Sequence, residues 1–510
     1  MFRSLTNTEL VEIAFHEINA LLREYAEWLF VSDGVAQSLR RDEIEVAVMQ
    51  RRLMLSCWTE KGTRLWRVVA WEWKEQSLEL EVSRRMGAEV SLIQLIPRTS
   101  AKAITATIRA ARQMRCERLA QLASGLQFGS VVERMSLSRG TKPGQPGRNA
   151  QVLLKTRRER IAVTGPVVSS QPSVVDTFLS SSLLWFRRTS DRVKPPYVEQ
   201  LWLIVSPELL KPLLYRVALL RCSLRDIIKV FTVDEALTLL TEAACPDKDE
   251  LWRKKLARFP PVAAAIASER SHAIVAEAPE AIDIVHSRHG ETLRYFGLPF
   301  ARVRSLLGHE KVWFGINRAH RQLLDESNAN DWHNLLCDLR EHRSATAIDH
   351  RHAFYRAAPE AWLESLLRRD ITKLDPGLII APLHAQFRTA RGAKLGIRPI
   401  DLLALRQDGR LVVIELKVSE DREHVLQGAD YWRRVEAHRR RGHIARAKLF
   451  GARMIRDEAP LVYLVAPTLR VHPAFQTLAH CISSDIEIYR FDINEDWRSA
   501  VRVMRRTRVN

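Results

Sequence analysis

The sequence has few cysteines, and none of them is at metal-binding spacing. Its six cysteines are scattered along 510 residues, and no C-x-x-C pair occurs among them. Isolated cysteines are typical of small buried side chains in a reducing compartment, so we expect no structural zinc. His286 and His289 lie near Glu291 but lack the H-E-x-x-H pattern, which favours a structural or solvated pair over a metal site.

Long apolar runs are also absent. No stretch reaches the roughly 18 apolar residues that would span a membrane. Glu and Arg interrupt the apolar pattern of residues 1–30, unlike the uninterrupted core of a signal peptide. We therefore expect a cytoplasmic protein without a membrane partner. Internal repeats, a Walker loop, a G-x-S-x-G elbow and zinc-finger spacing are missing as well.

The chain has an excess of positive charge. It contains 79 Lys and Arg against 60 Asp and Glu, a formal net charge of +19. Such a field favours polyanions, of which nucleic acid is the commonest, although a generally basic surface is the alternative. Because single hydrophobic cores stop growing near about 250–300 residues, we expect a multidomain α/β protein with about two to four domains.

Residues 1–135 read as an N-terminal α+β domain. Apolar spacing predicts helices, and alternating segments separated by polar turns predict an antiparallel meander. Trp71 and Trp73 share one face of its middle strand, where we favour a place in the core over base stacking. The predicted helices span residues 8–29 and 103–122, and the predicted strands span 53–58, 65–73 and 78–82.

A Gly- and Pro-rich cluster from Gly140 to Arg148 predicts a domain boundary or a mobile loop. Beyond it we expect a middle α/β region over 150–345, of unknown function, with strands at 151–154, 160–163 and 201–205. Its last part, 317–351, is polar and helical and is expected to connect to a final domain over 350–510.

The final domain carries the clearest pattern. Pro359 starts a predicted helix to Arg369, and a strand is expected over 378–387. Two apolar strands then follow, joined by an Asp-Gly turn, which is a strong hairpin signal. Asp401 opens the first of these strands, and Glu415 lies near the end of the second.

The hairpin brings charged side chains together. Side chains alternate along a strand, so Glu415 and Lys417 share one face while their apolar neighbours pack on the other. In an antiparallel pair the start of one strand lies beside the end of the next, which places Asp401 near both. Two close carboxylates with oxygen ligands suit Mg²⁺ or Mn²⁺.

These residues resemble the PD-(D/E)XK nuclease superfamily. The matching runs are Pro399-Ile400-Asp401, with one residue inserted between proline and aspartate, and Glu415-Leu416-Lys417. Gln427 and Tyr431 look like the Q-x-x-x-Y motif of one branch, and Glu364 occupies the place of the family's additional acid. The resemblance covers about residues 350–492. It implies a restriction-endonuclease-like core, a mixed central sheet flanked by helices in the order αβββαβ.

The resemblance also implies an activity, the metal-dependent hydrolysis of DNA, often in repair or genome defence. Asp401 and Glu415 would bind Mg²⁺ (or Mn²⁺), with Glu364 as a further ligand. Lys417 would orient or deprotonate the attacking water and stabilise negative charge, and Gln427 and Tyr431 would position water or phosphate. RNA is not excluded as a substrate.

A run of basic residues follows the motif helix. These arginines are expected to contact the phosphate backbone, with a solvated basic helix end as the alternative; they are Arg433, Arg434, Arg439, Arg440 and Arg441. Two further readings stay open at this point. One is an inactive nuclease fold that binds nucleic acid or a protein, and the other is a sensing or recruiting N-terminal region, through which a partner or a second copy could also bind.

Overall fold

The computed structural model describes the chain except for a set of short segments. These are residues 1, 33–34, 60–61, 75, 85–88, 140–145, 169–173, 235, 247, 254–255, 257–258, 260–265, 288–289, 307–308, 318–320 and 390–398. His289 and most of the Gly140–Arg148 cluster therefore lie outside the described residues. The chain divides into two compact units, and each is described by itself. The first consists of Met1–Ser170, Thr189–Pro207 and Ile228–Ala243.

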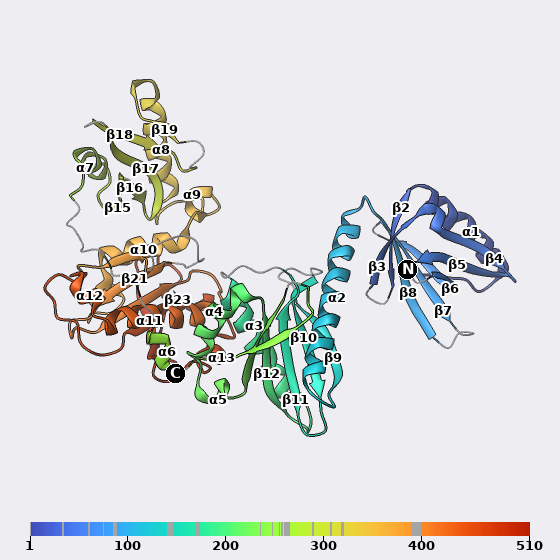
Figure 1. Cartoon of the computed structure of the whole chain (residues 1–510). Helices are drawn as coiled ribbons and strands as arrows, with labels where there is room; N and C mark the ends of the chain where they lie inside the picture. The colour runs from blue at the N-terminus through green and yellow to red at the C-terminus, as the bar shows by residue number, and fades with distance from the viewer. Residues whose placement is uncertain are drawn as a thin grey trace. The chain divides into compact units, whose positions relative to one another are not determined.

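An eight-stranded antiparallel sheet forms the beginning of the first unit (Figure 1). Its order is β3-β2-β8-β7-β6-β5-β4, and β1 pairs with β6. The central strands β5, β6 and β7 form the antiparallel meander that the sequence predicts. The strands are β1 (Arg3–Ser4), β2 (Glu27–Ser32), β3 (Val35–Arg40), β4 (Ile44–Met49), β5 (Arg52–Thr59), β6 (Gly62–Lys74), β7 (Ser77–Arg84) and β8 (Glu89–Pro97).

Helix α1 (Thr8–Arg23) packs its apolar stripe on this sheet. Asn7 caps its start by accepting a hydrogen bond from the backbone N–H of Leu10. The predicted extension of the helix to residue 29 is wrong, because Trp28 and Phe30 alternate into the core from β2 instead. Trp71 is 4% exposed and belongs to the same core, so its predicted place in the core is confirmed.

A second, six-stranded sheet has the order β14-β13-β12-β11-β10-β9 and is covered by α2 (Ala101–Leu126). Strands β9 and β10 pair with each other across residues 140–145. The Gly- and Pro-rich cluster therefore connects two strands of one sheet, and the division that we expected between residues 135 and 150 falls inside this sheet. Its strands are β9 (Val131–Arg139), β10 (Pro146–Lys155), β11 (Arg160–Pro166), β12 (Val198–Val205), β13 (Ile228–Val233) and β14 (Leu240–Ala243).

The second unit contains a five-stranded antiparallel sheet in the order β15-β16-β17-β18-β19. Helix α8 (Ala329–His342) packs on it through Leu336 and Leu339, so this part of the predicted connector belongs to a core. His286 pairs with Glu291 across the first hairpin, a structural role. The strands are β15 (Ile282–Ser287), β16 (Gly290–Tyr295), β17 (Leu298–Leu306), β18 (His309–Phe314) and β19 (Gln322–Leu323), and α7 (Glu269–Ala276) lies beside them.

Arg343 joins this sheet to the chain that follows. Its side chain is fully buried and donates hydrogen bonds to the carbonyls of Tyr295 (2.8 Å), Phe296 (2.7 Å), Phe354 (2.6 Å) and Ala357 (2.8 Å). Burial lowers the pKa of its guanidinium to about 9. Because a buried cation without hydrogen bonds is very costly, this set of acceptors fixes the hairpin and the later segment together.

The last sheet has six strands in the order β20-β21-β22-β23-β24-β25, with antiparallel and parallel pairs. Helix α10 (Pro359–Arg369) begins at the predicted proline and contributes to the core on one face of the sheet. Helix α11 (His424–Arg440) contributes to the core on the other. The strands are β20 (His384–Phe387), β21 (Ile400–Leu405), β22 (Leu411–Leu416), β23 (Leu461–Pro467), β24 (Ile488–Ile493) and β25 (Val503–Arg508).

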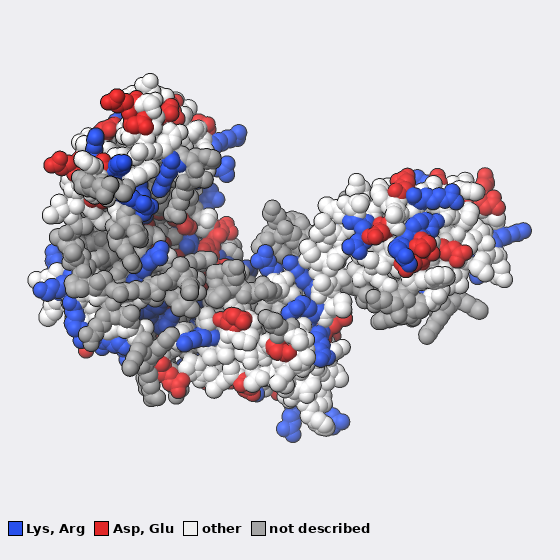
Figure 2. Space-filling view, turned by 45° about the horizontal axis from the view of Figure 1, so that its top comes forward, with Lys and Arg blue, Asp and Glu red and all other residues white. Residues whose placement is uncertain are grey.

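The protein is thus a mixed α/β chain with several sheets, as its sequence predicts. In the part of the chain that the structure describes, no helix has the length and apolar character needed to cross a membrane. Basic and acidic side chains are interspersed on the face shown in Figure 2. The excess positive charge is therefore not gathered into one uniform patch on that face.

Candidate active site

The β21–β22 hairpin positions the predicted acids as expected. Leu402 lies opposite Ile414, and continuing this register by one step sets Asp401 beside Glu415. The turn between the strands contains Gly409 at φ 82°, a left-handed conformation that glycine adopts at little cost. The predicted pairing of Asp401 and Glu415 is therefore confirmed.

Asp401 is held by hydrogen bonds from two directions. The backbone N–H of Leu416 donates to Asp401 Oδ2 over 2.9 Å. Gln386 Nε2 lies 3.5 Å from Asp401 Oδ1 and donates to Glu364 Oε2 over 2.6 Å, so it bridges the two acids. Glu364, 3% exposed on α10, is thereby brought to the site that the sequence predicted.

Lys417 follows the end of β22 and turns back to Glu415. Its ammonium group donates to Glu415 Oε1 over 2.8 Å and lies 3.8 Å from Asp421. Burial lowers the pKa of Lys417, but the neighbouring charges of Glu415 and Glu360 outweigh burial and raise that pKa overall. Lys417 is therefore a fixed cation in this state and is poorly suited to remove a proton from water.

Four carboxyl groups lie around this ammonium, those of Glu415, Asp421, Glu360 and Asp401, whereas Glu364 lies near Asp401 and Arg294. Burial raises the pKa of Asp401, of Glu364 and of Glu360, and it raises the pKa of Glu415 well above its usual value, with the charge of Asp401 adding to the effect. Glu415 Oε2 is buried and receives no hydrogen bond from the described residues. This excess of buried negative charge is what a bound cation would relieve.

Mg²⁺ commonly uses only one or two protein carboxylates and keeps several waters. Asp401 and Glu415 fit that requirement, since their carboxyl groups lie side by side and Glu415 Oε2 accepts no hydrogen bond from a described residue. Among the residues that the structure describes, no group of three or more His, Cys, Asp or Glu side chains is arranged to hold a metal ion. Glu364 reaches Asp401 through Gln386, so its role as a direct ligand stays a prediction.

Helix α11 presents Gln427 and Tyr431 one turn apart. Gln427 is 2% exposed; its Nε2 lies 3.2 Å from Glu423 Oε2, and its Oε1 is buried with no donor among the described residues. Burial raises the pKa of the Tyr431 phenol, and the charge of Glu415 raises it further, which places this ring near the acids. Tyr431 therefore lies near the acids, whereas Gln427 contacts Glu423, and the role of both residues in the motif stays a prediction.

Two further residues at the site, Gln386 and His424, were not predicted from the sequence. Gln386 lies in the predicted strand but has a left-handed backbone, φ 49°, which turns it toward the acids. His424 Nε2 lies 3.2 Å from the carbonyl of Glu415, and burial lowers the pKa of this imidazole to about 4, so it is neutral. A polar residue within an apolar strand was the only signal for Gln386, and none existed for His424.

The predicted phosphate-binding arginines have partners inside the protein. Arg433 and Arg434 pair with Asp430, at 2.6 and 3.4 Å. Arg439 and Arg440 pair with Glu436, at 2.7 and 2.6 Å, and Arg441 donates to the carbonyl of Ala437. Four of these arginines neutralise buried acids on α11 and Arg441 binds a backbone carbonyl, so their contact with phosphate stays a prediction.

Asp430 also meets a cation from outside the last domain. Arg216, on α4 (Pro207–Val217), lies 3.2 Å from Asp430 and 2.9 Å from Asp176. Burial raises the pKa of Asp430, but its neighbouring arginines outweigh burial and lower that pKa overall. This buried network anchors the middle of α11, the helix that carries Gln427 and Tyr431.

Comparison with known proteins gives no relative: no protein-family model, curated protein or solved structure matches the chain.

Proposed function

We propose that this protein is a metal-dependent nuclease that hydrolyses phosphodiester bonds in DNA. The observation that carries the proposal is the group formed by the buried Glu415 and Lys417 and the partly buried Asp401 at one end of the β21–β22 pair. The order of elements around it supports a restriction-endonuclease-like core, since α10, three strands, α11 and β23 follow one another as αβββαβ.

The arrangement has no evident structural purpose. Burying charged side chains is expensive unless they are fully paired, and here the carboxyl groups of Glu415, Asp401 and Glu360 lie around the one buried ammonium of Lys417. A sheet that served only stability would place apolar residues at these positions. The free-energy cost of burying these charges is explained if the site binds a metal cation and a phosphate.

Each residue has a role that follows from its contacts. Asp401 and Glu415 would hold Mg²⁺ or Mn²⁺, and the backbone N–H of Leu416 keeps Asp401 oriented. The metal, when bound, lowers the pKa of coordinated water and neutralises charge on the scissile phosphate. Lys417, held as a cation by Glu415, stabilises the negative charge that develops on the phosphate. The buried Gln427 Oε1, which has no donor among the described residues, would accept a hydrogen bond from a water or a phosphate hydroxyl.

The test is cleavage of supercoiled and linear DNA by the whole protein in Mg²⁺ or Mn²⁺, with EDTA as a control. Asp401→Ala and Lys417→Ala are compared with Asp457→Ala, which removes a carboxylate that is 100% exposed. We expect metal-dependent cleavage in the wild type and Asp457→Ala, and none in the two site variants. Folded protein that binds DNA but never cuts it would instead identify an inactive binding module.

A further inference from the structure

One face of the five-stranded sheet is basic. Alternate residues of β16, β17 and β18 point into the core, and the residues between them form the opposite face. That face presents Thr292, Arg294, Arg302, Arg304, Lys311 and Trp313. Apolar and polar residues alternate here as in any sheet that has one face in solvent. The polar face is unusual because four of its six residues are Arg or Lys.

The register adds to this imbalance. Arg302 lies between Thr292 and Trp313 in one row across three strands, and Arg304 lies directly opposite Lys311 in the next. Like charges at directly opposed positions destabilise a sheet. An anionic ligand on this face would relieve their repulsion.

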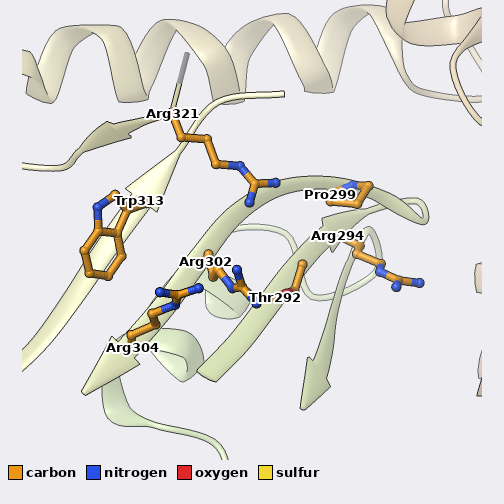
Figure 3. Close-up of a pocket in the computed structure, with 7 residues that line it drawn as sticks. All are labelled: Thr292, Arg294, Pro299, Arg302, Arg304, Trp313 and Arg321. Atoms are coloured by element: carbon orange, nitrogen blue, oxygen red, sulfur yellow. The ribbon is translucent and has the colours of Figure 1, made fainter. Parts of the chain in front are cut away.

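The same face forms a pocket of about 430 Å³. Its described lining includes no carboxylate and consists of Thr292, Arg294, Pro299, Arg302, Arg304, Trp313 and Arg321. Figure 3 shows Arg302, Arg304 and Arg321 extending over the sheet, with Trp313 on one side and Arg294 on the other. The guanidinium of Arg304 lies 5.9 Å from the centre of the Trp313 ring.

Acids beside this face are engaged elsewhere. Asp283, opposite Arg294 in the sheet, accepts from Ser365 and pairs with Arg369 at 3.4 Å. Glu310 accepts from the backbone N–H of Arg270 over 3.0 Å. These partners offset part of the negative charge of Asp283 and Glu310, so the two acids neutralise the pocket arginines less.

The pocket adjoins the candidate active site through one residue. Arg294 lines the pocket, and its Nη1 lies 3.8 Å from Glu364 Oε1. Glu364 in turn contacts Gln386, which reaches Asp401. A polyanion lying along the pocket therefore has one end beside the acids.

We propose that this face binds a single strand of nucleic acid, with phosphates against Arg302, Arg304 and Arg321 and a base stacked on Trp313. Arginines in a groove combined with an aromatic platform are the usual means of binding single strands without regard to sequence. Arg294 marks the point where the strand passes to the acidic site, and only this last step rests on the proposed nuclease function.

The test measures binding, not cleavage. A fluorescent 20-nucleotide single-stranded DNA is titrated with the whole protein carrying Lys417→Met, in EDTA, at several salt concentrations. The surface variants are Arg302→Glu with Arg304→Glu, and Trp313→Ala and Trp313→Phe. The matched control is Arg157→Glu with Arg158→Glu, which makes the same change of charge at an exposed turn. Thermal melting confirms that each variant is folded.

We expect the Arg302/Arg304 pair of substitutions to weaken binding at least about tenfold and to reduce the salt slope by about 1.4, since each phosphate contact contributes about 0.7. Trp313→Ala should weaken binding about fivefold or more, and Trp313→Phe should retain it. Equal losses in the surface and control pairs, or wild-type binding by Trp313→Ala, would overturn the proposal. If binding depends on the surface residues but the wild-type protein never cuts DNA, the binding proposal stands and only the proposed nuclease function is overturned.

Discussion

The ammonium of Lys417 and the carboxylate of Glu415, two residues apart, meet over 2.8 Å in the interior of the protein. Lys417 does not satisfy all of the hydrogen-bonding capacity and charge around Glu415. The Oε2 atom of Glu415 accepts no hydrogen bond from a described residue, and the carboxyl group of Asp401 lies alongside. The pair therefore separates two functions that can be measured apart. Lys417 supplies positive charge to the substrate, whereas the carboxylates attract a metal.

Lys417→Met should reduce cleavage by about 10²–10³-fold, as expected when one preorganised donor is lost from a transition state. It should retain, or increase, the rise in melting temperature caused by Mg²⁺, because the carboxylates remain and lose their competing cation. Cleavage rates and melting with and without Mg²⁺ test this. A Lys417→Met protein that no longer responds to Mg²⁺ would contradict the separation of roles.

Asp401→Asn should stabilise the metal-free protein by about 1–3 kcal/mol at pH 8. The amide can still accept from Leu416 and can donate to Glu415, and one of the crowded charges is gone. The acids at this site have raised pKa values in the folded state, so the folded protein holds protons that the unfolded chain has lost. Their contribution to stability therefore falls as the pH rises above about 4–5.

The advantage of Asp401→Asn over the wild type should accordingly grow from pH 5 to pH 8 in EDTA, and should disappear in Mg²⁺. Urea unfolding at each pH measures it. A pH-independent difference, or a variant that still gains stability from Mg²⁺, would show that Asp401 is not part of a cation site.

Gln427→Leu should leave the free energy of unfolding within about 1 kcal/mol of the wild type. The substitution removes a buried Oε1 without a described donor, and it gives up the contact to Glu423. Cleavage should nevertheless fall at least about tenfold, the size expected when one hydrogen bond in the transition state is lost. Gln407→Leu, in the hairpin turn, is the control and should cleave normally. Equal activity of the two variants would place Gln427 outside the reaction.

Asp430→Asn should destabilise the protein by about 3–5 kcal/mol at pH 7, because Arg216, Arg433 and Arg434 would lose a shared buried partner. The lowered pKa of Asp430 makes its contribution present above about pH 4 and lost as the pH falls toward the folded value. Asp457→Asn, at an exposed pair, should cost less than about 1 kcal/mol. Similar losses in both variants, by urea unfolding, would argue against the buried network.

The hairpin could be predicted because its signals are local. Alternation fixed the faces of Glu415 and Lys417, and the Asp-Gly turn fixed which strands pair. The pairing of the arginines was also readable, since Asp430 with Arg433 and Glu436 with Arg439 stand three residues apart on a helix. Proximity to the site favours contact with phosphate, but Asp430 just before Arg433 and Glu436 just before Arg439 supply nearer partners.

Other features depend on contacts between distant residues. The bridge by Gln386 needs a left-handed turn of the backbone and an acid from another helix. The strands on either side of the Gly- and Pro-rich cluster, β9 and β10, pair in one sheet, because breaker residues occur between paired strands as well as in linkers. Residues Thr292–Tyr295 alternate between exposed and buried positions, as in a strand, but this run was too short to predict the five-stranded sheet.

The four carbonyls that Arg343 binds belong to both the five-stranded sheet and the segment just before α10. Its guanidinium also lies 4.7 Å from the Trp362 ring on α10, and Phe296 stacks on the same ring at 5.3 Å. A fragment beginning at residue 350 would lack Arg343 and Phe296. It would therefore uncover one face of the Trp362 ring and leave the carbonyls of Phe354 and Ala357 without their donor. A fragment meant to keep the acidic site intact should therefore begin before β15, so that it includes the five-stranded sheet.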